Sequence, residues 1–129
     1  MADQCNIKRW DLLKGRLKNV PATSFSDWWA AHPTVLLIDC RRADEHQAVH
    51  LEGSVNIDYL AYSFWDEIEK LPRDGCYLLY CNTSRRSTRA CTLMQNAGYE
   101  QTFNLDGGLK AWKEKVGDII FEKAVVRKK

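Results

Sequence analysis

The sequence has no long apolar run, no large excess of one charge and no close-spaced cysteine framework. No stretch of its 129 residues approaches the roughly 20 apolar residues needed to cross a bilayer. Residues 1–14 carry charged side chains where a secretory signal would need an apolar block. A net charge of +2 is too small to predict a nucleic-acid partner, and five unframed cysteines fit a reducing compartment. We therefore expect a cytoplasmic protein that binds neither membrane nor nucleic acid.

Pairs of metal-ligating residues are also scarce. His46 and His50 are four residues apart, but no cysteine or third histidine accompanies them nearby. A zinc site needs three or four such ligands. We therefore expect no metal site and no cofactor.

The length and composition of the chain are those of one globular domain. A chain of 129 residues can bury a core of its own, and a hydrophobic content of 45% is ordinary for a soluble protein. We expect the core of the single domain to span residues 18–116. An N-terminal extension would precede it at residues 1–17, and a C-terminal tail would follow at residues 117–129.

Short apolar segments alternate with helical patterns along the chain. The predicted strands are residues 18–20, 35–38, 54–57, 77–80 and 102–105. The predicted helices are residues 23–30, 43–49, 59–71 and 88–97, with another beginning at residue 109. This alternation predicts an α/β fold with a central, mostly parallel sheet of about five strands and helices on both faces.

The loop between the predicted strand 77–80 and the next helix holds the strongest candidate site. Cys81 would sit at the carboxyl end of the strand, where α/β proteins keep reactive groups. The start of the helix favours an anion there, and Arg85 and Arg86 add positive charge. A thiol in this position is expected to ionise more readily than a free one and to act as a nucleophile. The alternative is a buried, structural cysteine.

A second group of polar residues follows the predicted strand 35–38. Asp39 and Arg41 would face the same crevice as Cys81 if their two strands are neighbours. They could form a salt bridge with each other or position the active loop. Cys40, between them, could form a disulfide with Cys81 or relay sulfur, or it could be a buried strand-end residue.

Three segments together resemble, in order, the motifs of the single-domain rhodanese family. The first is residues 39–57, which begin Asp-Cys-Arg, include Glu45 and end His-Leu-Glu-Gly-Ser-Val-Asn-Ile, similar to D-x-R…E…G-H-I-P-G-A-x-N-I. The second is residues 81–87, similar to C-x-x-G-x-R-S. The third is residues 105–112, which contain the closing G-G-x-x-x-W. The resemblance implies a rhodanese-like domain.

The resemblance also implies a thiosulfate sulfurtransferase. Cys81 would take the outer sulfur of a small anionic donor such as thiosulfate, hold it as a persulfide, and pass it to a thiol, a protein or cyanide. Arg86 would face the sulfonate of the donor, and Asp39 and Arg41 would support the loop from behind. The implied substrate-binding residues are Asn82, Thr83, Ser84, Arg85, Arg86 and Ser87.

The chain departs from the family pattern at three positions. Val49 and Glu52 replace a glycine and a proline, and Ser84 stands where the family has glycine in the loop. Glycine there tolerates a positive φ, so the serine is expected to strain or reshape the loop.

Two other functions stay open. One is a rhodanese-like adapter without catalysis, although the chain retains Cys81 and Arg86. The other is a cysteine phosphatase or arsenate reductase. The phosphatase pattern C-x-x-x-x-x-R needs arginine at position 87 and a histidine before the cysteine, where this chain has Ser87 and Tyr80.

Overall fold

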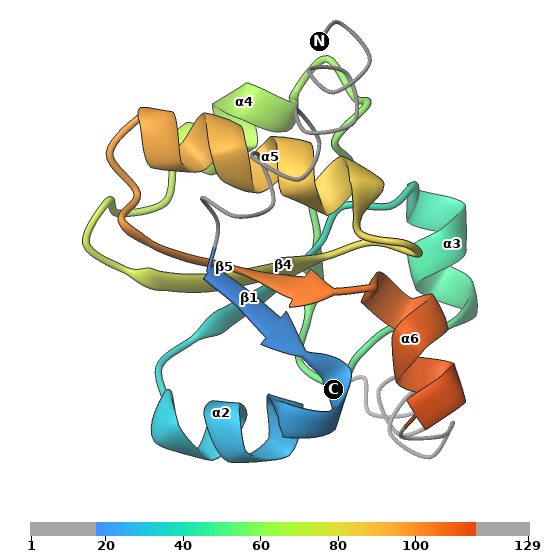
Figure 1. Cartoon of the computed structure of the whole chain (residues 1–129). Helices are drawn as coiled ribbons and strands as arrows, with labels where there is room; N and C mark the ends of the chain where they lie inside the picture. The colour runs from blue at the N-terminus through green and yellow to red at the C-terminus, as the bar shows by residue number, and fades with distance from the viewer. Residues whose placement is uncertain (1–17, 116–129) are drawn as a thin grey trace, which may run out of the picture.

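The computed structural model describes residues 18–115, which form a five-stranded sheet with helices on both faces (Figure 1). The strands are β1 (Lys18–Pro21), β2 (Leu36–Asp39), β3 (Val55–Asn56), β4 (Cys76–Tyr80) and β5 (Gln101–Asp106). The order across the sheet is β1-β5-β4-β2-β3, and every pairing is parallel. This confirms the predicted α/β class. The predicted N-terminal extension and C-terminal tail lie outside the described residues.

Each strand is followed by one or two helices. They are η1 (Ala22–Ser24), α2 (Phe25–Ala31), α3 (Ala43–Ala48), α4 (Phe64–Glu69), α5 (Arg85–Asn96) and α6 (Gly108–Lys115). No helix among residues 18–115 is long and apolar enough to span a membrane.

Two helices differ by three or more residues at one end from their predicted bounds. The helix predicted at residues 59–71 is shorter in the structure, where it is α4 (Phe64–Glu69). The residues before it form a turn instead, in which the Asp58 side chain accepts a hydrogen bond from the Leu60 amide at 2.9 Å. Leu60 is therefore 69% exposed and does not join the apolar face of the helix. Conversely, α5 begins at Arg85 rather than at residue 88. Both loop arginines consequently belong to its first turn.

The central strand β4 is buried on both faces. Tyr77 and Leu79 pack in the apolar cluster that includes Ile68 of α4 and Met94 of α5. Leu78 and Tyr80 pack in a second cluster on the opposite face, with Phe25 of α2 and Trp112 of α6 among its members. Burial on both faces explains why the strand is a continuous apolar run rather than an alternating one.

The strand order brings three loops to one edge of the sheet. Strand β4 lies between β2 and β5, and in parallel strands all three carboxyl ends point the same way. The loops into α3, α5 and α6 therefore meet at that edge (Figure 1). This edge is where an open parallel sheet binds its ligands.

Candidate active site

Cys81 lies between the end of β4 and the first turn of α5. The residue is 1% exposed, and part of its side chain belongs to the apolar cluster under α4 and α5. Its sulfur nevertheless meets polar groups. The Ser87 amide donates to Cys81 Sγ at 3.4 Å, and the thiol donates to the Ser87 hydroxyl at 3.6 Å. The start of α5 thus presents a main-chain donor to the sulfur atom.

Ser87 is itself held by the neighbouring strand. Its hydroxyl donates to Asn104 Oδ1 at 2.7 Å, and Asn104 is fully buried in β5. The Asn104 amide group donates in turn to Asn19 Oδ1 at 3.0 Å. Asn104 therefore fixes the hydroxyl that accepts from the Cys81 thiol. The sequence pattern marks Asn104 only as part of a strand, and its contact with Ser87 depends on the order of the strands.

Ser84 has a left-handed backbone conformation. Its φ is 70° and its ψ is 7°, and it is the only non-glycine residue among residues 18–115 with a positive φ. The residue is 2% exposed and precedes the first residue of α5. The loop thus adopts the positive φ that the glycine of the family motif would tolerate freely. A non-glycine residue in this region is strained by about 1–2 kcal/mol.

Replacing Ser84 by glycine is expected to stabilise the protein. Because glycine adopts the left-handed region without strain, Ser84→Gly should raise the free energy of unfolding by about 1 kcal/mol, after the larger backbone entropy of glycine is subtracted. Urea denaturation of the two proteins measures the difference. Ser84→Ala is the matched control, since it removes the hydroxyl but keeps the strain, and it should give no gain. A Ser84→Gly protein that unfolds more easily than wild type would show that the serine side chain outweighs the strain.

Glu45 of α3 ties the two ends of the Cys81 loop together. One carboxylate oxygen accepts from Asn82 Nδ2 at 3.0 Å, and the other accepts from Arg86 Nη1 at 3.2 Å. Burial would raise the pKa of Glu45, but hydrogen bonds from Arg42 and Arg86 and the charges of both arginines hold it below its usual value. The carboxylate is therefore ionised at neutral pH and balances part of the charge of Arg86.

Asp39 and Arg41 form a buried ion pair behind the same loop. Both residues are at most 3% exposed, and Arg41 Nη2 lies 2.8 Å from Asp39 Oδ2. His46 Nδ1 lies 2.9 Å from the same oxygen. The second Arg41 nitrogen, Nη1, donates to Asn82 Oδ1 at 3.3 Å. The two interpretations of this pair, mutual salt bridge and loop support, thus apply together.

The environment of Asp39 keeps its carboxylate charged. Burial alone would raise the pKa of Asp39. The hydrogen bonds from His46 and Arg41 and the charge of Arg41 together outweigh burial, so the pKa lies below its usual value. A carboxyl whose pKa is lower in the folded than in the unfolded state stabilises the fold above its unfolded pKa.

Asp39→Asn is expected to lower the free energy of unfolding by about 3 kcal/mol at pH 7, because the buried Arg41 loses its countercharge. The wild type loses the contribution of Asp39 as the pH falls below about 4, so the difference between the two proteins should narrow there. Urea titrations between neutral and acidic pH test both points. Asp44→Asn is the control, because Asp44 pairs with Arg42 on the surface, and it should change little. A difference in free energy of unfolding between the two proteins that stays constant with pH would contradict a stabilising, ionised Asp39.

The loop after β5 closes the site from the other side. The Leu109 amide donates to the Cys81 carbonyl at 2.9 Å, and the Lys110 amide donates to the Asn82 carbonyl at 2.9 Å. Gly108 has a φ of +63°, and a Cβ atom there would overlap the Cys81 carbonyl oxygen and lie 2.6 Å from that of Asn82. Gly108 therefore lets this loop approach the neighbouring Cys81 loop.

The predicted site residues do not all have the same surroundings. Contacts among side chains and main chain connect Asp39, Arg41, Cys81, Asn82, Arg86 and Ser87. Ser84 is buried within the loop, whereas Thr83 and Arg85 are exposed. His46 and His50 stack with ring centroids 3.9 Å apart. Among residues 18–115 no group of three or more histidine, cysteine, aspartate or glutamate side chains could hold a metal ion.

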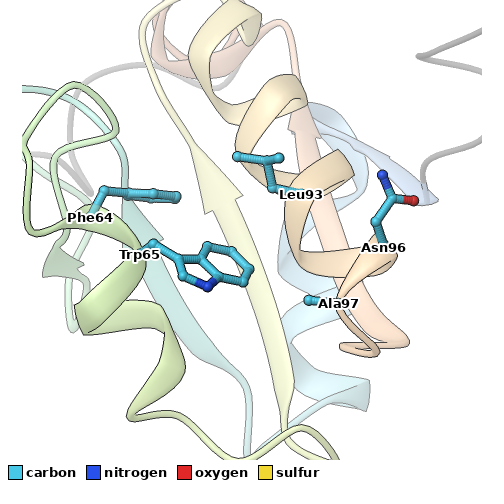
Figure 2. Close-up of a pocket in the computed structure, with 5 residues that line it drawn as sticks. All are labelled: Phe64, Trp65, Leu93, Asn96 and Ala97. Atoms are coloured by element: carbon cyan, nitrogen blue, oxygen red, sulfur yellow. The ribbon is translucent and has the colours of Figure 1, made fainter.

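A separate apolar groove of about 360 Å³ lies between α4 and α5 (Figure 2). It is lined by Phe64, Trp65, Leu93, Asn96 and Ala97. The α5 residues of this groove belong to the end of the helix farther from Cys81, and none of the lining residues is ionisable. We assign the groove no part in the chemistry.

Comparison with known proteins identifies the class to which this fold and site belong. The family model described as a rhodanese-like domain matches residues 22–115. This match covers more than half of the chain, so the protein belongs to the rhodanese-like domain family. The resemblance of its three sequence motifs to that family is thereby confirmed.

Several relatives are named as sulfurtransferases. The probable adenylyltransferase/sulfurtransferase MoeZ of Mycobacterium tuberculosis is 32% identical over 90 residues, which cover 70% of this chain but only 23% of MoeZ. A sulfurtransferase of Allochromatium vinosum is 26% identical, with 74% of this chain and 88% of that protein covered. The thiosulfate:glutathione sulfurtransferase of Saccharomyces cerevisiae is 25% identical, with 79% and 84% covered.

A solved structure shows the same fold. The rhodanese-related protein of Thermoplasma volcanium superposes with a TM-score of 0.65 and covers 77% of this chain and 93% of its own. Its sequence identity is 21%, so the likeness is one of fold.

Proposed function

We propose that the protein is a sulfurtransferase that carries sulfur as a persulfide on Cys81. The observation that supports this most directly is the position of Cys81 Sγ, 3.4 Å from the Ser87 amide at the start of α5. A main-chain donor and a helix start can stabilise the negative charge of a persulfide held in this loop. The sulfurtransferase names of relatives that cover most of this chain support the same reaction class.

In the first half-reaction the Cys81 thiolate attacks the outer sulfur of a donor such as thiosulfate. The sulfur–sulfur bond of the donor breaks, and sulfite leaves with the electron pair. The product is a persulfide whose terminal sulfur carries the negative charge. Arg86, held in place by Glu45, places a guanidinium at the loop that would meet the sulfonate of the donor. The buried ion pair of Asp39 and Arg41 keeps Asn82 in position beside it.

In the second half-reaction an acceptor thiolate attacks the terminal sulfur of the persulfide. The Cys81 thiolate is the leaving group, so the enzyme returns to its starting state without a cofactor. A small thiol, as in the name of the yeast relative, a protein thiol and cyanide are all acceptors of this kind. Two half-reactions through one covalent intermediate predict ping-pong kinetics.

The loop geometry favours sulfur transfer over phosphoryl transfer. The phosphatase pattern would put an arginine at position 87, where the serine instead directs its amide and hydroxyl toward Cys81 Sγ. A loop that presents one amide and one hydroxyl to a single sulfur atom suits a persulfide better than a tetrahedral phosphate.

Mass spectrometry of the loaded protein tests the proposal. The full chain is incubated with thiosulfate, desalted and digested, and the peptide containing Cys81 is expected to gain one sulfur atom. Cyanide should then remove that sulfur as thiocyanate. A protein that gains no sulfur from thiosulfate or from a small persulfide donor would be an adapter instead. Hydrolysis of p-nitrophenyl phosphate at a comparable rate would favour the phosphatase alternative.

A further inference from the structure

The register of β2 and β4 places Cys40 beside Cys81, one residue past the ends of the two strands. The ladder between β2 and β4 pairs Asp39 with Tyr80, and the Cys40 amide donates to the Tyr80 carbonyl at 2.8 Å. In a parallel ladder this bond extends the register by one residue and places Cys40 opposite Cys81. Neighbouring strands are about 4.8 Å apart. Disulfide-bonded cysteines have Cα atoms about 4.4–6.8 Å apart, so the backbone spacing permits a bond between these two.

The two side chains also lie on the same face of the sheet. Ile38 pairs with Leu79 two residues earlier in the same ladder. These two residues belong to one apolar cluster together with Cys40 and Cys81, as the alternation of side chains along each strand requires. Cys40 is fully buried and Cys81 is 1% exposed. Both thiols therefore share one apolar cluster, and Cys40 has no surface open to the solvent from which donors and acceptors arrive.

Its position shields Cys40 from reactions with molecules in solution. Burial raises the pKa of the Cys40 thiol well above its usual value, and the nearby Cys91 and Cys81 raise it further. A neutral, fully buried thiol reacts poorly with oxidants and acceptors from outside. It can react with an electrophilic sulfur that the fold places against it, because proximity replaces a bimolecular encounter.

We propose that Cys40 is a resolving thiol that discharges the Cys81 persulfide when no acceptor arrives. This inference rests on the proposed function. Cys40 Sγ attacks the inner sulfur, which is Sγ of Cys81, and the bond from that sulfur to the terminal sulfur breaks. The terminal sulfur leaves as hydrosulfide, with the electron pair of the broken bond and the proton of the Cys40 thiol. A disulfide between Cys40 and Cys81 remains.

The step needs no oxidant beyond the persulfide itself. The sulfane sulfur is reduced to sulfide, and the two cysteine sulfurs are oxidised to the disulfide. An acceptor attacks the terminal sulfur and regenerates the free Cys81 thiolate. Cys40 instead attacks the inner sulfur and leaves Cys81 in a disulfide. Two equivalents of a thiol reductant return the disulfide to its starting state. An enzyme loaded with sulfur in the absence of an acceptor would thus release one equivalent of sulfide and then stay inactive as the disulfide.

The experiment follows the loaded protein without an acceptor. Wild type, Cys40→Ala, Cys40→Ser and Cys91→Ala are loaded with thiosulfate, desalted and held under argon. Samples are denatured in acid with N-ethylmaleimide and analysed for intact mass and released sulfide. Chymotrypsin cuts after Tyr77 and Tyr80 and so separates Cys76 from Cys81. Trypsin cuts after Arg85 and separates Cys81 from Cys91.

All four proteins are expected to gain one sulfur atom. Wild type and Cys91→Ala should then lose it, release one equivalent of sulfide and show a linked pair of peptides that contain Cys40 and Cys81. Cys91 is the matched control, because it is equally buried in the same apolar cluster. Both Cys40 variants should keep the persulfide at least about tenfold longer, because they lack the intramolecular attack.

Two results would overturn the assignment while leaving the proposed function intact. One is a persulfide that decays as fast in the Cys40 variants as in wild type. The other is a disulfide that joins Cys81 to Cys76, to Cys91 or to a second chain. A wild type that gains no sulfur at all would instead refute the proposed function, and the resolving role would fall with it.

Discussion

Cys81→Ser is expected to lower the rate of thiocyanate formation from thiosulfate and cyanide by at least about a thousandfold. The serine hydroxyl is close in size to the thiol, so the fold should survive. Its oxygen is not ionised at neutral pH and cannot form the sulfur–sulfur bond that carries the transferred atom. The assay measures thiocyanate, and urea denaturation checks that the variant still unfolds cooperatively.

Cys76→Ser is the matched control for this experiment. Cys76 begins the same strand that ends before Cys81, but it lies at the opposite edge of the sheet from the loop. Its variant should retain turnover close to that of wild type. A Cys81→Ser protein that keeps more than about one-tenth of the wild-type turnover would show that another residue is the nucleophile. The buried Cys40 and Cys91 would then be the first residues to test.

Gly108→Ala is expected to destabilise the protein by about 4 kcal/mol or more. The added Cβ would overlap the Cys81 carbonyl oxygen, and the positive φ of 63° is unfavourable for alanine. The two loops would have to separate, which would break the bonds from the Leu109 and Lys110 amides to Cys81 and Asn82. Any protein that folds should also lose most of its turnover, because the Cys81 loop would move.

Gly53→Ala is the control that separates the backbone strain of a positive φ from the steric overlap expected in Gly108→Ala. Gly53 also has a positive φ, of +84°, but no atom lies within 4 Å of a Cβ built there. Its variant should lose only about 1–2 kcal/mol from backbone strain. Equal losses for the two variants, measured by urea denaturation, would mean that the close approach of the two loops contributes nothing to stability.

The sequence was sufficient to predict the strands of the sheet and the position of Cys81 after β4. Strand β4 is a continuous apolar run, and such a run is specific enough to place the strand and the loop after it. The motif also marked Ser84 as unusual, and the structure gives the reason in its positive φ. These features are local: each depends on residues close together in the chain.

The features that sequence reasoning missed or left open depend on contacts between residues far apart in the chain. Glu45 stands out only as part of a motif, and its bond to Arg86 joins residues 41 positions apart. The partnership of Ser87 with Asn104 likewise requires β5 beside β4. The pairing of Cys40 with Cys81 was conditional on the neighbourhood of two strands, and the strand order meets that condition.

The ion pair between Glu45 and Arg86 has a consequence for how the loop would attract the anionic donor of the proposed reaction. Two arginines at the start of α5 imply a strongly positive surface at the loop. The ionised carboxylate of Glu45, however, forms an ion pair with one of them, Arg86. The long-range electrostatic field around the loop is therefore weaker than the number of arginines alone implies, so short-range complementarity would decide which anionic donors bind in the proposed reaction. Under the proposed function, selection among sulfur donors would then depend on the shape of the loop, and a substitution of Glu45 in α3 would alter that selection by releasing Arg86 and Asn82.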